Sequence, residues 1–512
     1  MAEQISNSTE IAVRPAEPPV IAEPGGVTAT PPSPPEKENL TIGFKGYLRL
    51  LRIGLSVTFF AARVLFNNRR WLKSKKRADT ELRHSEGAAL REKLLALGPT
   101  FIKIGQTLAT RADLLPVEYI QELSKLQDQV PPFPDEQARE IITRELRAEI
   151  ADIFKEFGTE PVAAASLGQV YRATLQTGQV VAVKVQRPNI AEQIDLDIRV
   201  LRRVARILER YPDLIRGVDW QGTLDEFHVT ISEEMDYEQE ARNAETFRKN
   251  FVEWREVYVP QIYHTFSTRH LIVMEFISGL KVIDTEQLRA EGQNPHEVVT
   301  LLAKTYLKQL LEDGFFHADP HPGNLRVMAD GRLAFFDFGM VGRLSMELQS
   351  KLINAFFHIV ERDVHGLVED MVRLGFIELS PSEEQRFKPV IEALFDRYLS
   401  LRLGDVKFKE LIFDLAHVIY EFPFRIPANF TYIVRAIMTL EGIGTLVDPN
   451  FNFFEVARPY AKRFMFRREG RYLRQLIVNQ LIRGESGNIE WGKVWKLAKM
   501  AFRYYVRGEN KL

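Results

Sequence analysis

The chain has 512 residues and a formal net charge of −1, so its bulk charge predicts no polyanionic partner, and we expect no nucleic-acid binding. It contains no cysteine, which excludes disulfides, thiolate metal sites and a catalytic thiol and favours a reducing compartment. The N-terminus shows neither the basic-then-apolar pattern of a signal peptide nor the acid-poor composition of a transit peptide. We therefore expect a cytoplasmic protein, long enough for more than one domain.

Residues 1–40 are rich in proline and poor in large apolar side chains, which predicts a disordered tail. The next segment, 41–80, has no acidic residue before Ala78 and many basic ones. As a helix it would place a narrow polar stripe opposite a wider apolar surface, the stripe being Lys45, Arg49, Arg52, Ser56 and Arg63, the surface Leu48, Leu51, Leu55, Phe59, Phe60 and Leu65.

The apolar run between Arg52 and Arg63 is too short to cross a bilayer, which takes about 20 residues. An interfacial helix followed by a polybasic patch would bind anionic membrane lipid or a prenyl-lipid peripherally, and we expect no transmembrane helix. The alternative is a helix packed on the protein with a solvated basic tail.

The remainder predicts an α+β fold with two lobes, in the order found in protein kinases. Residues 81–135 and 190–250 have helical periodicity, and 161–186 alternate apolar and polar residues around a Thr177-Gly178 turn, as in a hairpin. A strand pair is expected within 259–279, and mainly helices follow from 295, apart from short strands flanking Asn324 and Asp337. The expected units are a helical extension (81–160), a small lobe with a helical insertion (161–280), a large lobe (281–455) and basic amphipathic helices (456–512).

Four residues occur in the chain order that kinase chemistry requires. Lys184 ends "VAVK", which in isolation would be an ordinary strand lysine. Asp319 and Asn324 have the spacing of the Asp and Asn in H-R-D-L-x-x-x-N, and Asp337 opens "DFG" after an apolar run. Together they predict Lys184 and Asp319 as catalytic residues and Asn324 and Asp337 as Mg²⁺ ligands, with ATP or ADP as nucleotide.

The stretch "FFHADPHPGN" also admits another interpretation, a metal-binding strand with His317, Asp319 and His321 at alternate positions. Pro320 and Pro322 make an alternating strand unfavourable, so we prefer the phosphoryl-transfer loop, with His317 holding it in place.

The loop expected to cover phosphate departs from the kinase pattern. Setting G-x-G-x-x-G-x-V against "AAASLGQV" leaves one of three glycines, although glycine lets the backbone approach phosphate closely. A tight connection without function is the alternative. The nucleotide-binding candidates here are Ala163, Ala164, Ala165, Ser166, Gly168 and Val170.

The segment after "DFG" is short. It passes almost at once into an amphipathic helix with Ser345 as a plausible N-cap, and it contains no A-P-E. Conventional protein kinases dock peptide substrates on that segment, so an ordinary protein kinase is disfavoured.

These motifs resemble the UbiB/AarF/ADCK family of atypical kinases over about residues 81–452. "KIGQ" at 103–106 is similar to the K-x-G-Q signature, "AAAS" to the alanine-rich loop, and "EEMDYEQEA" to the E-x-D…E-A element. "HADPHPGN" and "DFGMVG" match the catalytic and metal-binding loops nearly letter for letter, and the N-terminal extension looks like those of cyanobacterial or plastid members.

The resemblance changes the expected partner of Lys184. Ordinary kinase spacing favours Glu192 or Asp197, whereas the family pattern implies Glu240 as a third catalytic residue. It also implies that a K-x-G-Q helix covers the cleft and contacts the E-x-D element. The further nucleotide-site candidates are Lys103, Gln106, Glu234 and Asp236, to which we add Glu275.

The resemblance implies an atypical kinase or ATPase at a membrane surface that supports isoprenoid-quinone metabolism (ubiquinone, plastoquinone or tocopherol), with quinone-biosynthesis proteins as partners. Two alternatives stay open. One is a nucleotide-gated lipid-binding scaffold or chaperone with little turnover, and the other is a genuine protein kinase.

Overall fold

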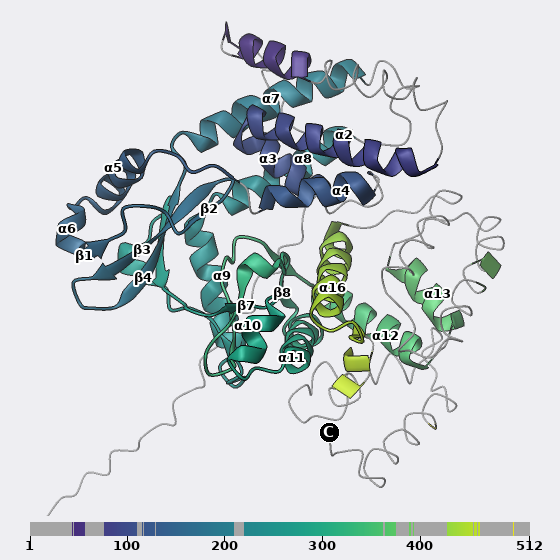
Figure 1. The fold of residues 1–512 in the computed structure, drawn as a ribbon. Coiled ribbons are helices and arrows are strands. Elements are labelled where there is room, and N and C mark those ends of the chain that lie inside the picture. Colours follow the sequence, from purple (N-terminus) through teal and green to yellow (C-terminus); the bar gives the residue numbers. More distant parts are fainter. Residues whose placement is uncertain are drawn as a thin grey trace, which may run out of the picture.

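The computed structural model describes residues 43–56 except 45, 76–109, 115, 117–127, 130–208, 220–361, 364–374, 428–453, 455–457, 459 and 460, together with the isolated positions 389, 390, 393 and 495. The expected tail 1–40 and nearly all of the expected helices 456–512 lie outside these residues. Within them the chain forms an antiparallel sheet followed by a mainly helical part, which confirms the α+β prediction (Figure 1).

A helical layer precedes the sheet, as expected for 81–135. It contains a helix at 46–56, α2 (Lys76–Leu97), α3 (Pro99–Leu108), α4 (Val117–Ser124) and the 3₁₀ turn η1 (Lys125–Gln127). Gly98, with φ +100°, makes the sharp turn between α2 and α3. The apolar faces of these helices share one core with α7 (Ile190–Leu208), and Figure 1 shows α7 and α8 stacked with α2, α3 and α4 above the sheet.

The sheet of the small lobe is built around the predicted hairpin. Strands β3 (Gly168–Leu175) and β4 (Val180–Gln186) are antiparallel, and Gly178 at the turn has φ +91°. The strand order is β1 (Phe154–Phe157), β3, β4 and β6 (Leu271–Glu275), with β2 (Ala163–Ala164) paired to β3. Helix α5 (Asp135–Leu146) shares a core with these strands, and the short α6 (Ile150–Ile153) leads into β1.

The helical insertion continues from α7 through α8 (Trp220–Glu234) to α9 (Tyr237–Asn250). The strand pair expected within 259–279 does not form as a hairpin. Only β6 is a strand there, and its main partner is β4, while a single bridge joins Ile262 to Met274 and η3 (His264–Phe266) lies between them. The neighbouring β5 (Val257–Tyr258) instead pairs with β10 of the large lobe.

The large lobe contains α10 (Thr285–Ala290), α11 (Pro295–Lys308), the π-helical turn η4 (Gln309–Asp313), α12 (Met346–Glu361), α13 (Val364–Arg373) and α16 (Ala428–Val447). The expected N-cap is confirmed, because Ser345 Oγ accepts a hydrogen bond from Leu348 N at 3.2 Å. The short strands are β7 (Leu280–Lys281), β8 (Phe315–His317), β9 (Leu325–Val327), β10 (Leu333–Phe335) and β11 (Val341–Arg343), with η5 (Pro322–Asn324) between β8 and β9.

Strand pairing brings the two predicted chemical loops together. β8 and β11 are antiparallel, with His317 opposite Val341, and β9 and β10 are antiparallel, with Leu325 opposite Phe335. The loop after β8 and the loop after β10 therefore emerge side by side, although they are about twenty residues apart in sequence.

The helix at 46–56 directs its two arginines toward the rest of the protein. Arg49 Nε lies 2.6 Å from Oδ1 of the buried Asp197, and Arg52 donates to the carbonyl of Ala96 at 2.6 Å, so both arginines face the protein. The outward face is apolar, with Phe44, Tyr47, Leu48, Leu51 and Leu55 exposed. The remaining residues of the expected stripe and surface are Ser56, which belongs to this helix, and Lys45, Phe59, Phe60, Arg63 and Leu65, which lie outside the described residues.

No helix in the described part of the chain is both long enough and apolar enough to span a bilayer.

Candidate functional site

Lys184, Glu240 and Asp337 meet between the sheet and α9. Lys184 Nζ lies 2.9 Å from both carboxylate oxygens of Glu240 and 3.3 Å from Asp337 Oδ2. Burial alone would lower the pKa of the Lys184 ammonium, but the charges of Asp337 and Glu240 outweigh it and raise that pKa. The pairing with Glu240 is the one that the family resemblance implied. Of the two ordinary alternatives, Asp197 is engaged by Arg49, and no contact places Glu192 at Lys184.

Asp337 is held in an unusual backbone conformation. Its φ is +67°, in the left-handed region that non-glycine residues rarely adopt, and Gly339 N donates to Asp337 Oδ1 at 3.3 Å. Burial would raise the pKa of this carboxyl, but the charge of Lys184 lowers it below its ordinary value, so Asp337 is ionised.

His317 fastens the two loops to each other. Its Nδ1 accepts a hydrogen bond from Asp319 N at 3.2 Å, and its Nε2 lies 2.8 Å from the carbonyl oxygen of Asp337. The ring therefore carries its proton on Nε2, and burial lowers its pKa so that it stays neutral. Gln309, in the π-helical turn η4, accepts from His317 N at 2.9 Å and fixes the strand below. This agrees with the expected role of His317 in holding the loop.

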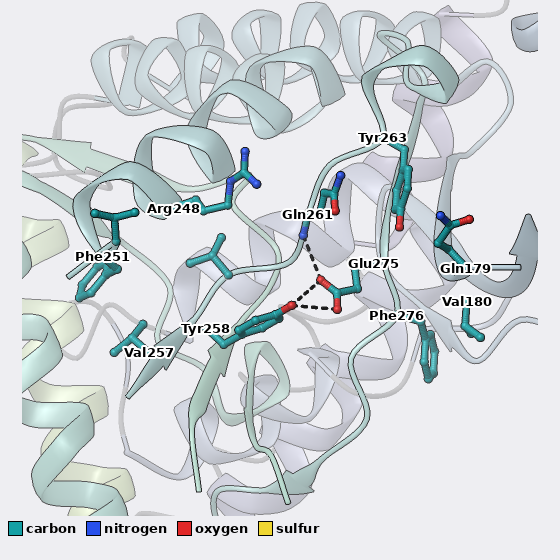
Figure 2. A pocket seen from close by; sticks show the side chains of 12 residues that line it. Gln179, Val180, Arg248, Phe251, Val257, Tyr258, Gln261, Tyr263, Glu275 and Phe276 are labelled. Atoms are coloured by element: carbon teal, nitrogen blue, oxygen red, sulfur yellow. Dashed lines mark hydrogen bonds between the residues drawn. The ribbon is translucent and has the colours of Figure 1, made fainter. Parts of the chain in front are cut away.

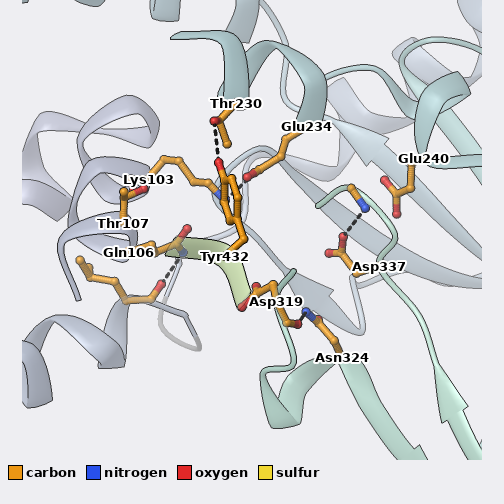
Figure 3. A network of polar contacts seen from close by, with 12 residues as sticks. Lys103, Gln106, Thr107, Thr230, Glu234, Glu240, Asp319, Asn324, Asp337 and Tyr432 are labelled. Atoms are coloured by element: carbon orange, nitrogen blue, oxygen red, sulfur yellow. Dashed lines mark hydrogen bonds and ion pairs between the residues drawn. The ribbon is translucent and has the colours of Figure 1, made fainter. Parts of the chain in front are cut away.

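Asp319 and Asn324 lie at adjacent ends of their loop. Asn324 Nδ2 donates to the carbonyl of Asp319 at 3.1 Å (Figure 3). The Asp319 carboxylate accepts a hydrogen bond from the guanidinium of Arg435 at 2.8 Å. Arg435 was not among the residues predicted from the sequence. Burial would raise the pKa of Asp319, but the charges of Arg435 and Lys103 lower it to about 2.

Arg435 comes from α16, 116 residues beyond its partner. A single arginine in an apolar helix gives no sequence signal for such a contact. Tyr432 lies three positions before Arg435, about one helical turn away on the same helix face. Its hydroxyl lies 3.1 Å from Thr230 Oγ1 of α8 (Figure 3).

The alanine-rich loop is a tight turn at the edge of the sheet. Ala163 and Ala164 pair with β3, Ala165 N donates to Gly168 O at 2.8 Å, and Ser166 is buried. A Cβ on Gly168 would lie 2.5 Å from both Tyr237 Oη and Val185 O, which explains the one glycine that remains. Val170 is opposite Lys184 in the hairpin and therefore shares its face of the sheet.

The K-x-G-Q helix contacts the E-x-D element, as the resemblance implied. Lys103 Nζ on α3 lies 2.5 Å from Glu234 Oε2 at the end of α8. Gln106 lies beside it, but its side-chain nitrogen donates to the carbonyl of Leu126 at 3.0 Å and so ties α3 to the neighbouring turn (Figure 3). Lys103 is thus directed to the site, whereas the amide nitrogen of Gln106 is used within the helical layer.

Two candidates have side chains directed elsewhere. Asp236 caps α9, because its Oδ1 accepts from Gln239 N at 2.9 Å. Glu275 lies opposite Val181 in the β4–β6 pair, and Val181 is three positions before Lys184 on β4. Because side chains alternate along a strand, the side chain of Glu275 lies on the other face of the sheet from Lys184. Its carboxylate accepts from Tyr258 and from Gln261 N (Figure 2). A nucleotide contact from either residue would have to come from the backbone.

The donor set fits a magnesium nucleotide. Mg²⁺ prefers carboxylate and carbonyl oxygens and usually keeps few protein ligands when phosphates complete its shell. Asp337 provides an ionised carboxylate, and the side-chain oxygen of Asn324 remains available because its nitrogen bonds Asp319.

Comparison with known protein families agrees with this geometry. The ABC1 atypical kinase-like domain matches residues 125–371, and the UbiB helical domain matches residues 391–452.

Several individual proteins are similar over most of the chain. An uncharacterized protein of Synechocystis sp. is 40% identical over 80% of this chain and 72% of its own length. Activity of bc1 complex kinase 3, a chloroplastic protein of Arabidopsis thaliana, is 40% identical over 80% of this chain, which spans 57% of that protein. The solved complex of Rv3197 with erythromycin from Mycobacterium tuberculosis is 25% identical with a TM-score of 0.47, covering 73% of this chain and 95% of that one.

Proposed function

This chain belongs to the ABC1/UbiB family of atypical kinase-like proteins, and on that premise we propose that it transfers the terminal phosphoryl group of ATP, as an atypical kinase or ATPase. The observation that carries the proposal is the Lys184–Glu240 pair with Asp337 at 3.3 Å, beside a loop that presents Asp319 and Asn324. A kinase-like domain of this kind implies nucleotide binding.

Each residue has a distinct part in the proposed reaction. Lys184, held by Glu240, positions the α- and β-phosphates, while Asp337 and Asn324 would hold Mg²⁺, which when bound would neutralise charge on the phosphates. Asp319 orients the acceptor hydroxyl or water and takes its proton as the bond to the γ-phosphorus forms and the bond to the ADP oxygen breaks.

Two variants separate nucleotide binding from turnover. Asp337→Asn removes a metal ligand, and we expect it to abolish Mg-nucleotide binding in a calorimetric titration. Asp319→Asn should bind Mg-ATP normally but lose turnover by about a hundredfold or more, the usual contribution of a general base. Asp330→Asn makes the same change on an exposed turn and is the control. Unchanged turnover in Asp319→Asn would refute the proposed mechanism.

We also propose peripheral binding to an anionic membrane through the outward face of the helix at 46–56. That face carries Phe44, Tyr47, Leu48, Leu51 and Leu55, all exposed. The sequence that follows it has no acidic residue before Ala78 and provides positive charge for anionic lipid, at Arg63, Arg69, Arg70, Lys73, Lys75, Lys76 and Arg77.

The membrane proposal has a matched test. Leu51 and Val229 are both 59% exposed, so an aspartate at either position costs little folding energy. Leu51→Asp should reduce co-sedimentation with phosphatidylglycerol vesicles several-fold, whereas Val229→Asp should not. Equal binding by both variants would exclude this face from the contact.

The link to isoprenoid-quinone metabolism rests on the family resemblance. We expect a strain that lacks the gene to show an altered prenyl-quinone profile, restored by the parent protein but not by Asp337→Asn. An unchanged profile in the deletion strain would contradict it.

A second candidate, a nucleotide-gated scaffold with little turnover, is favoured by two contacts. Lys103 is paired with Glu234 over the cleft, and Arg435 occupies one oxygen of Asp319. Tight nucleotide binding without turnover, even with anionic vesicles present, would favour it. A genuine protein kinase is disfavoured because only eight residues separate Asp337 from the start of α12 at Met346, and phosphotransfer to a protein in trans, lost in Lys184→Ala, would reverse that ranking.

A further inference from the structure

A second cleft lies at the end of β6, away from the residues proposed for phosphoryl transfer. Its volume is about 560 Å³, within the range of small-molecule sites. Its walls come from the start of β4, the C-terminal end of α9, residues 257–263 and the end of β6 (Figure 2). Lys184, Asp319 and Asp337 do not line it. An occupant would therefore bind independently of the phosphate-binding residues.

Glu275 lies at the centre of this cleft. Its half-buried carboxylate accepts hydrogen bonds from Tyr258 Oη at 2.9 and 2.8 Å and from Gln261 N at 3.3 Å (Figure 2). All of these donors are neutral, so within the described chain the negative charge has hydrogen bonds but no ion-pair partner. Arg248, the cation on the same wall, is engaged with Glu245 at 2.9 Å.

The neighbouring rings make the surroundings of this carboxylate favourable for a cation. Tyr258, Tyr263 and Phe276 all line the cleft, and electron-rich ring faces attract ammonium and guanidinium groups. The guanidinium of Arg332 lies over Tyr258 at 4.3 Å and that of Arg172 lies over Phe276 at 5.4 Å, so among the described residues Tyr263 is the ring whose faces a ligand cation would use first. The charge of Glu275 contributes to the raised pKa of both tyrosines, after burial, so both phenols stay protonated near it. A carboxylate among aromatic rings is the arrangement by which proteins recognise organic cations.

We propose that this cleft binds a small organic cation, an ammonium or guanidinium group on a compact apolar body, with Glu275 as its counter-ion. Val257 and Val259 provide an apolar surface for the body of the ligand. The side chains of Gln179 and Gln261 line the cleft and supply neutral hydrogen-bonding groups. The chemistry disfavours anions, because a carboxylate or phosphate would meet the charge of Glu275, while the Arg248 guanidinium on the same wall is paired with Glu245.

The test uses phenethylammonium as the probe, titrated calorimetrically into the full-length protein. Phenylacetate and 2-phenylethanol have the same ring but carry a negative charge and no charge. We expect phenethylammonium to bind at least tenfold more tightly than either. Glu275→Gln should weaken its binding by about tenfold or more, the usual contribution of a charge-assisted hydrogen bond, while Glu286→Gln, the same change on an exposed helix, should not.

Three results would overturn the proposal: equal binding by Glu275→Gln, equal binding of phenylacetate, or displacement of the probe by Mg-ATP. If Glu275→Gln does not fold, Tyr263→Leu removes one ring instead, and undiminished probe binding there is the contrary result. Repeating the titration with Asp337→Asn keeps this proposal separate from the proposed phosphoryl transfer, because probe binding should survive a loss of nucleotide binding.

Discussion

Arg435 changes what the catalytic loop can do at the scale of a single residue. A carboxylate that accepts a proton must have a pKa not far below the working pH, and Arg435 holds the pKa of Asp319 at about 2. In the contact described here Asp319 is therefore a weak base that orients the acceptor, and the proposed proton transfer to it requires Arg435 to move away. An acceptor or nucleotide that draws Arg435 away from Asp319 would raise the pKa of Asp319 and make it a stronger base.

The pH dependence of turnover tests this effect of Arg435. Asp319 has a depressed pKa, so its ionised form is present above about pH 2 and is lost only as the pH falls through that value. In Arg435→Gln the pKa should rise above the ordinary value of about 3.9, because burial then acts against fewer positive charges. The acid limb of the turnover profile should move to higher pH, and Arg435→Lys should restore it. An acid limb unchanged in Arg435→Gln would contradict the assignment.

The helix at 46–56 shows, at the scale of elements, what sequence periodicity leaves undetermined. Its pattern gave two faces, but not which face meets the protein, since basic stripes are usually solvated. Asp197 reverses the usual outcome: it is fully buried on α7, and Arg49 is its counter-ion. An unpaired buried carboxylate would cost more free energy than is lost by leaving the apolar side chains of this helix exposed to solvent.

The Arg49–Asp197 pair makes a quantitative prediction. Arg49→Ala leaves a buried carboxylate without its partner and should lower the free energy of unfolding by roughly 3–5 kcal/mol, measured by urea denaturation. Arg49→Met combined with Asp197→Leu replaces the pair with apolar side chains and should recover most of that loss. Additive losses in the double variant would show that the pair is not coupled.

Local motifs predicted most of the site, because hairpin and loop chemistry depend on short segments. The Thr177-Gly178 turn, the strand position of Lys184 and the Asp319–Asn324 spacing all follow from neighbouring residues, and the structure has them as expected. Contacts between segments distant in sequence could not be predicted from local motifs. The Lys184–Glu240 pair, 56 residues apart, came only from the family resemblance, and Arg435 came from neither source. Strand pairing of β5 also depended on the other lobe, which no local pattern describes.

In the molecule as a whole, two helices that are remote in sequence contact the residues around the proposed site. Helix α3 is tied to the end of α8 by the Lys103–Glu234 ion pair, and α16 contacts Asp319 through Arg435 and Thr230 through Tyr432 (Figure 3). Burial raises the pKa of Glu234, and Lys103 opposes that rise. The Lys103–Glu234 ion pair thus holds the helical layer against the end of α8.

Hydrogen exchange measures how much the attachment of α3 to the end of α8 depends on Lys103. In Lys103→Met the pKa of Glu234, already raised by burial, should rise further, and the amides of α3 and the end of α8 should exchange several-fold faster. The β3–β4 hairpin should be unaffected, and Lys155→Met, on an exposed strand position, should change neither region. Lys103→Met with Glu234→Gln removes the buried charge as well, so faster exchange that persists there is due to the lost tie between the layers. If α3 exchanges at the parent rate in both variants, its apolar core alone holds the helical layer on the kinase-like lobes, and Lys103 is free to act on the nucleotide.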